Sequence, residues 1–174
     1  MEQKNLWAPW RIEYIKGLSE KSDCFVCDYI AAPEKDTENL VLWRTENFLV
    51  LFNRFPYNNG HMLICPKRHI PDLDSASDIE LAEMMKLTRD CQKVLSASVN
   101  PHGFNVGINF GRCAGAGLPD HMHIHIVPRW NGDTNFMAVC GQTDVISQGL
   151  KDLYVDLKQK SSELDLPGIA ISDK

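Results

Sequence analysis

The chain has 174 residues, of which 44% are apolar and 24% are charged. This composition is typical of a single globular domain and excludes a disordered or fibrous protein. The 18 Lys and Arg residues are outnumbered by 23 Asp and Glu, and the net charge of −5 argues against a surface built for nucleic acid or an anionic membrane. A polyanionic ligand would therefore need a local binding site.

Charge placement and cysteine usage also indicate the compartment. Charged residues interrupt positions 1–20, where a signal peptide needs a continuous apolar stretch. The longest apolar runs, such as residues 48–52, fall far short of the roughly 18 residues that span a membrane. Six cysteines are too few for a disulfide-stapled scaffold of this length. We therefore expect a cytoplasmic protein with reduced thiols, and with neither nucleic acid nor membrane as a partner.

The first part of the chain predicts an anchored segment followed by strands. Residues 1–20 carry more aromatic side chains than a free tail, so we expect them to pack on their own domain or on a second copy. Strands are predicted over residues 40–43 and 48–52, joined by a polar hairpin turn. A third strand over 62–65 follows a turn-rich stretch and stops at Pro66.

The clearest helix begins near Ser77, where Ser77-x-x-Glu80 forms a capping box. Side chains at three-and-four spacing predict its buried stripe, namely Leu81, Met84, Met85, Thr88, Cys91 and Leu95. The break at residues 100–103 ends this helix.

Two further strands and a last helix complete the predicted domain. Apolar and polar residues alternate over 104–110, which predicts a strand with one buried face, and another strand is expected over 122–127. A second amphipathic helix is predicted from about 144 to 164, within a C-terminal helix and tail at 144–174. With no internal boundary, residues 1–174 read as one α+β domain, a small antiparallel sheet with flanking helices.

Three histidines alternate in the segment His121-Met122-His123-Ile124-His125. A period of two places the imidazoles on one face of a strand and the apolar side chains on the other. A surface strand that happens to contain histidines is the plain alternative, but half of the six histidines fall on these alternate positions. Imidazole serves as a metal ligand or as a nucleophile and proton carrier near neutral pH. One alternative is therefore a catalytic metal held by all three histidines, as in a small oxygenase.

A glycine-rich loop, residues 111–120, runs directly into the first of these histidines. Glycines allow backbone N–H groups to turn inward as a nest for phosphate oxygens. Asn105 and Asn109 are expected on the polar face of the preceding strand. This combination favours a phosphate-binding site beside the histidines.

The pair Cys24-x-x-Cys27 has the spacing of half a zinc site, whose other two N or S ligands must lie far away in sequence. A redox dithiol or two buried small residues are the alternatives. The remaining cysteines are predicted to pack in the interior or at the surface without a second cluster, namely Cys65, Cys91, Cys113 and Cys140.

The run of residues 121–127 resembles the motif His-x-His-x-His followed by two apolar residues, which names the histidine triad (HIT) superfamily. Asn53 and residues 60–69 resemble the upstream strand of that family. Residues 6–11 and 128–136 look like its bacterial branch, which includes diadenosine tetraphosphate phosphorylases. The resemblance implies a HIT-like fold, a homodimer whose sheets join, and nucleotidyl transfer through a covalent histidine intermediate.

The same resemblance assigns roles to individual residues. His123 would be the nucleophile that attacks the α-phosphorus, with His125 and His61 contacting the phosphate and ordering the imidazoles. Substrate binding would involve Asn53 at the ribose, Asn109 with Gly115, Ala116 and Gly117 at the phosphates, and Trp130 near the nucleotide. A structural zinc would be held by Cys24, Cys27, His69 and His121, which would pin the N-terminal segment to the active strand.

The preferred activity is phosphorolysis of diadenosine tetraphosphate to ATP and ADP, with inorganic phosphate as the acceptor. A first alternative uses water instead and makes the protein a hydrolase of dinucleoside polyphosphates or nucleoside phosphoramidates that releases AMP. A second alternative is a zinc-stabilised nucleotide-binding protein without turnover.

Overall fold

A computed structural model describes residues 24–133 and 146–169, so the expectation for residues 1–20 lies outside the described part. It contains a five-stranded sheet in the order β1-β2-β3-β5-β4 with antiparallel neighbours throughout. The strands are β1 (Val41–Arg44), β2 (Phe48–Phe52), β3 (Met62–Pro66), β4 (Gly103–Ile108) and β5 (Ile124–Arg129). The predicted α+β architecture with an antiparallel sheet is confirmed.

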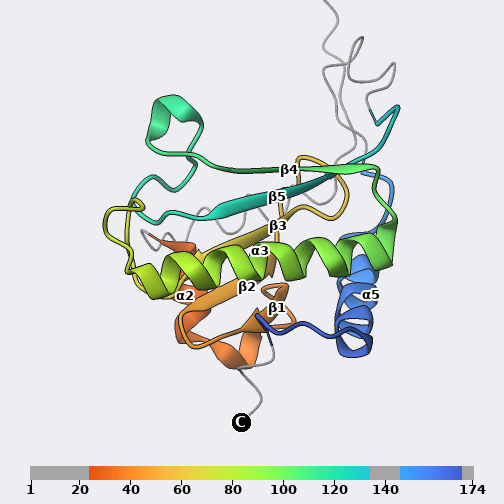
Figure 1. The fold of residues 1–174 in the computed structure, drawn as a ribbon, viewed down its shortest axis with the longest axis horizontal. Coiled ribbons are helices and arrows are strands. Elements are labelled where there is room, and N and C mark those ends of the chain that lie inside the picture. Colours follow the sequence, from red (N-terminus) through yellow and green to blue (C-terminus); the bar gives the residue numbers. More distant parts are fainter. Residues whose placement is uncertain (1–23, 134–145, 170–174) are drawn as a thin grey trace, which may run out of the picture.

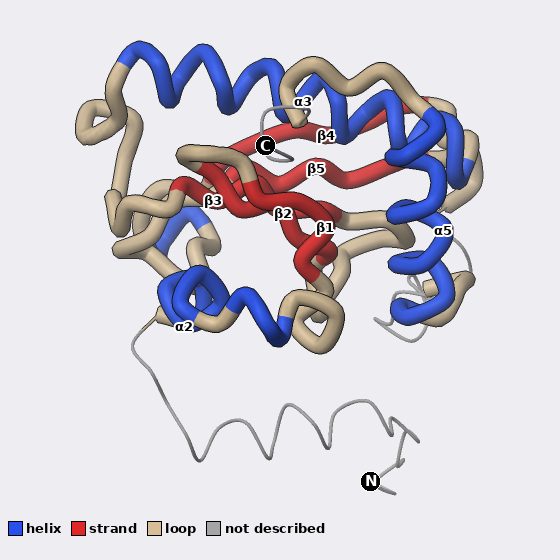
Figure 2. Tube along the Cα trace, turned by 90° about the horizontal axis from the view of Figure 1, so that it is seen from below, coloured by secondary structure: helices blue, strands red, loops and turns tan. Residues whose placement is uncertain are grey.

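Helices cover both faces of this sheet. The described α-helices are α2 (Phe25–Ala31), α3 (Asp78–Val99) and α5 (Leu150–Glu163), and two short 3-10 turns are η1 (Pro33–Lys35) and η2 (Arg112–Ala114). Figure 1 shows α3 running across one face with α5 beside its C-terminal half. Figure 2 shows α2 on the opposite face. The larger apolar core therefore lies between the sheet, α3 and α5, and a smaller one lies under α2.

Helix α3 begins as the capping box predicts. The N–H of Glu80 donates to Ser77 Oγ, and the Glu80 carboxylate accepts from the N–H of Ser77 at 2.8 Å. The predicted stripe is wrong at Met85, whose side chain is 64% exposed, whereas Leu87 and Val94 are buried. Met85 follows Met84 by one residue, which turns it about 100° away from the buried side.

The two edges of the sheet differ. At β1 the hydroxyl of Tyr154 donates to the Val41 carbonyl at 2.9 Å and Lys158 Nζ donates to the Leu42 carbonyl at 2.7 Å, so α5 covers that edge. At β4 the outer side has no neighbouring strand among the described residues. The predicted buried face of residues 104–110 is wrong in part, because Val106 is 44% and Phe110 is 42% exposed. Helix α3 packs on β3 and β5 and leaves much of the edge strand uncovered.

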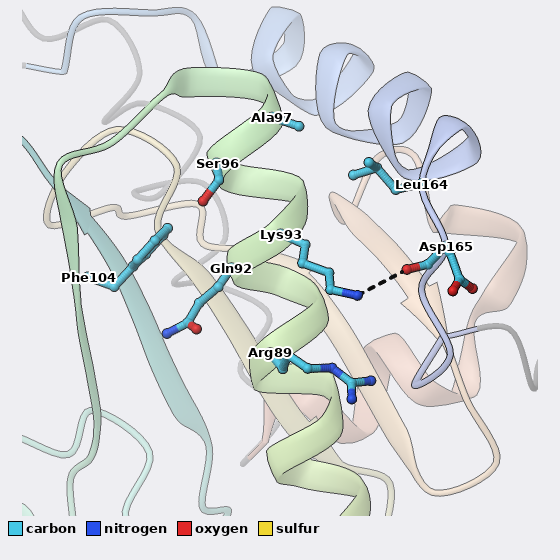
Figure 3. A pocket seen from close by; sticks show the side chains of 8 residues that line it. All are labelled: Arg89, Gln92, Lys93, Ser96, Ala97, Phe104, Leu164 and Asp165. Atoms are coloured by element: carbon cyan, nitrogen blue, oxygen red, sulfur yellow. Dashed lines mark hydrogen bonds between the residues drawn. The ribbon is translucent and has the colours of Figure 1, made fainter.

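The last helix starts later than predicted, at Leu150, because Gly149 has an extended backbone with ψ of 135°. The segment after α5 returns to α3: the N–H of Gly168 donates to the fully buried Asp90 carboxylate at 2.5 Å, and Lys93 Nζ donates to the Asp165 carbonyl at 3.3 Å. An open groove lies along this side of α3 (Figure 3), lined by Arg89, Gln92, Lys93, Ser96, Ala97, Phe104, Leu164 and Asp165. No helix within the described ranges is long and apolar enough to cross a membrane.

Candidate active site and metal site

The histidine segment runs into the middle of the sheet. Strand β5 pairs with β3 on one side and β4 on the other, so His125 lies opposite Leu63 and Gly107. Met122, which faces away from the imidazoles, is 2% exposed. Ile124 and Ile126 on the same side are buried in the core as well. The prediction of one core face and one imidazole face is confirmed.

One ring nitrogen of His123 makes a hydrogen bond and the other has no partner among the described residues. Its Nδ1 lies 3.0 Å from the backbone carbonyl oxygen of His121. Because a carbonyl oxygen only accepts, Nδ1 carries the proton and Nε2 keeps a lone pair. Burial lowers the pKa of His123 below its usual value, which favours the neutral ring. A neutral imidazole with a free Nε2 is suited to nucleophilic attack.

A second pair of imidazoles lies beside it. The backbone N–H of Tyr57 donates to His61 Nδ1 at 3.1 Å, and the side-chain amide of Asn53 lies 3.1 Å from the same atom. Since His61 Nδ1 accepts, the proton of a neutral His61 is on Nε2, which is 3.0 Å from His125 Nδ1. His125 then carries its own proton on Nε2. The chain of contacts therefore ends in an N–H donor at His125.

The glycine-rich loop approaches this donor through Asn109. The side-chain amide nitrogen of Asn109 lies 3.5 Å from His125 Nε2. With the His125 proton on Nε2, both nitrogens are donors, so they make no hydrogen bond to each other and can converge on one acceptor. A β-carbon on Gly115 would lie 3.9 Å from the Asn109 amide. Gly115 has φ of +88°, a left-handed conformation that favours glycine. Ala116 is buried, whereas a β-carbon on Gly117 would meet nothing within 4 Å. The structure thus brings Asn109 to His125 and Gly115 to Asn109, while phosphate binding by these residues stays a prediction.

The hydrogen-bond donors at this site are neutral imidazoles. Burial, together with the nearby His125 and His123, lowers the pKa of His61 to about 3. Burial and His123 lower the pKa of His125 to about 4. Both rings are therefore neutral near pH 7, and their hydrogen-bond directions are set by the contacts described above.

The four predicted metal ligands also meet. One donor atom from each of Cys24, Cys27, His69 and His121 lies within 4.8 Å of the others. Cys24 Sγ is 3.2 Å from His121 Nδ1, and Cys27 Sγ is 3.3 Å from His69 Nδ1 and 3.7 Å from His121 Nδ1. Two ligands of one tetrahedral zinc, a thiolate and an imidazole nitrogen, stand about 3.5 Å apart. The cluster can hold a metal ion.

The protonation pattern of the cluster fits the same use. His121 Nε2 donates to the Pro66 carbonyl at 2.7 Å, which leaves Nδ1 without a proton and pointed at the thiols. Burial raises the pKa of the Cys27 thiol to about 11, with the neighbouring Cys24 adding to the effect. A positive ion among the sulfur atoms would reverse that shift and leave thiolates.

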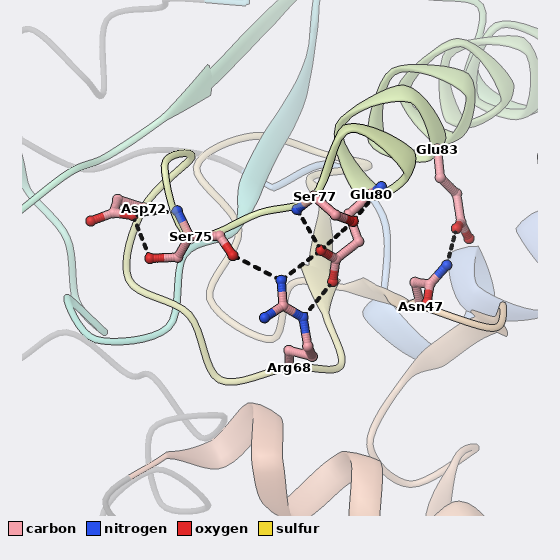
Figure 4. Close-up of polar contacts among 7 residues, drawn as sticks. All are labelled: Asn47, Arg68, Asp72, Ser75, Ser77, Glu80 and Glu83. Carbon is pink, nitrogen blue, oxygen red and sulfur yellow. Dashed lines mark hydrogen bonds and ion pairs between the residues drawn. The ribbon is translucent and has the colours of Figure 1, made fainter.

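The loop that carries His69 is tied to the start of α3 (Figure 4). Arg68 Nε and a terminal guanidinium nitrogen donate to the two Glu80 carboxylate oxygens at 2.8 and 2.6 Å. A third contact runs from Arg68 to the Ser75 carbonyl at 2.8 Å. The Arg68 hydrogen bonds hold the pKa of Glu80 well below its usual value. The sequence does not predict this pair, because Lys67 and Arg68 are adjacent charges at a strand end, and such side chains are usually solvated.

Other predicted residues lie elsewhere. The indole N–H of Trp130 donates to the carbonyls of Val99 and Asn100 at 3.2 and 3.1 Å, at the end of α3. About 16 Å of extended chain separates it from His125. The described chain does not bring Trp130 to the histidines, and its contact with the nucleotide stays a prediction. Cys65 and Cys91 are buried and Cys113 is exposed, while Cys140 lies outside the described residues.

The sheet and the imidazole strand define a class of protein. A family model described as HIT domain matches residues 34–132, and the chain belongs to this family. Within it, the chain is similar to the AP-4-A phosphorylase of Mycobacterium tuberculosis, at 38% identity over 155 residues that cover 86% of this chain and 80% of that protein.

Two further comparisons bear on activity and metal. A bis(5'-nucleosyl)-tetraphosphatase (asymmetrical) of Schizosaccharomyces pombe is 33% identical over 93 residues, covering 53% of this chain and 50% of its own. A crystal structure of a Zn-bound histidine triad family protein from Mycobacterium smegmatis superposes with a TM-score of 0.67 at 26% identity, covering 82% of this chain and 95% of that one. The family, the fold and a cluster able to bind metal are therefore shown.

Proposed function

We propose that this protein is an enzyme that transfers a nucleoside monophosphate from diadenosine tetraphosphate to inorganic phosphate, through a covalent bond to His123 Nε2. The proposal rests on His123 Nδ1, which lies 3.0 Å from the His121 carbonyl and donates its proton to it. Nε2 is therefore the nitrogen of this ring that keeps a free lone pair. The similarity to an AP-4-A phosphorylase over 86% of the chain supports the choice of substrate and acceptor.

In the first step, His123 Nε2 attacks the α-phosphorus. An N–P bond forms, the bond from phosphorus to the bridging oxygen breaks, and ATP leaves with that electron pair. The ring becomes positively charged, and its Nδ1–H strengthens the hydrogen bond to the His121 carbonyl. In the second step, an oxygen of inorganic phosphate attacks the same phosphorus. The N–P electron pair then returns to Nε2, and ADP is released.

Neutral donors would stabilise the charge that builds on the phosphoryl oxygens. His125 Nε2–H lies at the end of the His61–His125 contact, with Asn109 beside it. Backbone N–H groups of residues 115–117 complete the edge that would face the nonbridging oxygens. Asn53, next to His61, would face the ribose.

The acceptor test distinguishes this function from its rivals. The enzyme is incubated with diadenosine tetraphosphate with and without inorganic phosphate, and products are separated by anion exchange. We expect repeated turnover to ATP and ADP only when phosphate is present, and at most one ATP per active site without it. AMP formed equally well without phosphate would instead establish the hydrolase alternative, which the similarity to a tetraphosphatase favours.

Covalent labelling separates an enzyme from a non-catalytic binding protein. Diadenosine tetraphosphate labelled at the α-phosphorus should attach its nucleotide to the wild-type chain, with an acid-labile N–P bond, and not to H123A. Reversible binding without any attached label would support the zinc-stabilised binding protein.

We also propose that the metal of the Cys24, Cys27, His69 and His121 cluster is a structural zinc. Two sulfur and two nitrogen donors suit zinc, and four protein ligands leave no open position for substrate. Cys24 caps the start of α2, while His121 leads into β5. A zinc ion would therefore tie the first described helix to the active strand.

The expected homodimer would use the β4 edge. That edge has exposed Val106 and, just beyond it, exposed Phe110, and an unpaired strand edge offers hydrogen bonds to a second chain. Light scattering on the wild-type protein, which we expect in the cytoplasm, should give the mass of two chains. Val106→Lys should give one chain, whereas Ile79→Lys on the exposed side of α3 should not change the mass. A monomeric wild type would contradict this assignment.

A further inference from the structure

Tyr57 lies in the loop between β2 and β3 and covers one side of the histidine pair. Its ring centroid is 4.6 Å from that of His61, and 5.6 Å from that of His125 with an angle of 17° between the planes. The side chain is 56% exposed, so it covers the histidines from the solvent side. Its backbone N–H donates to His61 Nδ1 at 3.1 Å.

The loop holds this ring in place through contacts at both of its ends. The N–H of Asn53 donates to the His61 carbonyl at 2.8 Å, and the N–H of His61 donates to the Asn58 carbonyl at 3.2 Å. The Asn58 side-chain amide donates to the Pro128 carbonyl at 3.2 Å and to Asp133 at 2.9 Å. Tyr57 therefore sits on a loop braced against the far end of β5.

We infer that Tyr57 is a positioning residue: its N–H fixes which nitrogen of His61 is protonated, and its ring fixes the orientation of His61 and His125. The inference rests on the proposed function only in that His125 Nε2–H is to meet a phosphate oxygen. Tyr57 itself need not touch the substrate.

The consequence of losing this arrangement follows from donor and acceptor counting. If His61 carried its proton on Nδ1, that N–H would face the donors of Tyr57 and Asn53, and its Nε2 lone pair would face His125 Nδ1. His125 would have to place its proton on Nδ1 to make the contact. Its Nε2 would then carry a lone pair that accepts from the Asn109 amide 3.5 Å away, and the edge would lose two donors to an anionic phosphate. One shifted proton at His61 therefore turns a donor at the substrate into an acceptor.

The ring of Tyr57 also keeps water from the pair. The titratable groups beside His125 are Tyr57 and His61, from the loop before β3, and His123, which directly precedes β5. Gly107 of β4 and Asn109 just after it are uncharged. Burial is the main cause of the low pKa of His125. Removing the covering ring should therefore raise that pKa toward 6.5.

The test compares wild type, Tyr57→Phe, Tyr57→Ala and Tyr57→Pro in the full, metal-loaded chain. Tyr57→Ala removes the ring, whereas Tyr57→Pro also removes the backbone N–H. Nitrogen-15 NMR of the imidazoles should show one Nε2–H tautomer for His61 and His125 in wild type and Y57F. A scalar coupling across the hydrogen bond should join the Tyr57 amide nitrogen to His61 Nδ1. In Y57P, which removes the N–H, we expect mixed tautomers. In Y57A, which keeps the N–H and removes only the ring, we expect an acid limb of kcat/KM shifted to higher pH, with kcat lowered about tenfold near neutral pH.

Each contrary outcome is specific. An Nδ1–H tautomer of His61 in the wild type would overturn the inference even if the enzyme is fully active. A Y57A variant with raised KM but an unchanged pH profile would show that Tyr57 contacts substrate instead. A single Nε2–H tautomer of His61 in a folded Y57P would remove the N–H from its assigned role. If the protein does not catalyse the proposed reaction, the NMR comparison still tests Tyr57. The positioning role of Tyr57 and the proposed function can therefore be rejected independently. Zinc content of Y57A reports whether the variant has kept its fold.

Discussion

His121 and His123 lie two residues apart and carry their protons on opposite ring nitrogens. His121 donates Nε2–H to the Pro66 carbonyl and turns a bare Nδ1 to the two thiols. His123 donates Nδ1–H to the His121 carbonyl and leaves Nε2 bare. One backbone carbonyl in each case selects the ring nitrogen that remains available. Identical side chains in the segment that leads into β5 thereby present different nitrogens, which suit one ring for a metal ion and the other for nucleophilic attack.

The largest effect is expected when His123, the proposed nucleophile, is removed and the metal ligands are left intact. H123A should lower turnover of diadenosine tetraphosphate by about 10⁴-fold or more, because it removes the Nε2 that is proposed to form the covalent bond. Its zinc content, measured by atomic absorption, should stay at about one ion per chain. Loss of zinc in H123A would mean that the two clusters are not separable as described.

The second prediction concerns removal of the metal, with His123 left intact. Prolonged chelation should lower the free energy of unfolding by about 4 kcal/mol relative to protein in zinc a thousandfold above its dissociation constant. Cys27→Ser should lose zinc and resemble the chelated wild type, while the exposed Cys113→Ser should retain both zinc and stability. Denaturant titrations with and without zinc provide the measurement. A chelated protein of unchanged stability would exclude a structural metal.

The third prediction concerns acid, where the histidine pair should weaken the fold. The pKa values of about 3 for His61 and about 4 for His125 lie below the ordinary 6.5, so the unfolded chain binds protons that the folded chain does not. The contribution of these groups is complete above pH 6.5 and is lost as pH falls from 6.5 toward 4. Each fully shielded histidine gives a slope of up to about 1.4 kcal/mol per pH unit, and less where water reaches it. H125Q should flatten the stability curve in this window; an unchanged slope would contradict the assigned shift.

The smallest effect is expected at the brace of the metal site. Arg68→Met should weaken zinc binding about tenfold, because Arg68 holds the His69 loop through Glu80. Arg89→Met is a matched control, since Arg89 also pairs with an acidic residue of α3 but lies away from the loop. Competition with a chromophoric chelator measures both. Equal affinities in the two variants would remove Arg68 from this role.

Local patterns predicted the parts of this site that depend on neighbours in sequence. The capping box at Ser77 and Glu80 forms within one turn, and the alternation at residues 121–125 needs only an extended strand. The Cys24 and Cys27 pair is visible by its spacing, but its two histidine partners came only from the family resemblance. The structure then brought all four donor atoms together.

Features set by tertiary packing were not predictable. Val106 alternates like a core residue, yet its strand became a sheet edge. The role of Tyr57 depends on its backbone N–H, which any residue but proline supplies, so no side-chain pattern could mark it. The Arg68 pair with Glu80 joins a loop to a helix start and has no periodic signature.

The alternation along β5 also limits how this protein can change length. One residue inserted or deleted between His121 and His125 would turn Met122 or Ile124 toward the thiols and the phosphate site, and send imidazoles into the core. The side chains of the adjoining loop at residues 111–120 do not alternate between two faces of a sheet, so a change in loop length does not exchange buried and exposed positions. Length variants among descendants of this chain should therefore accumulate in the loop, while the five residues of the histidine segment stay constant in number.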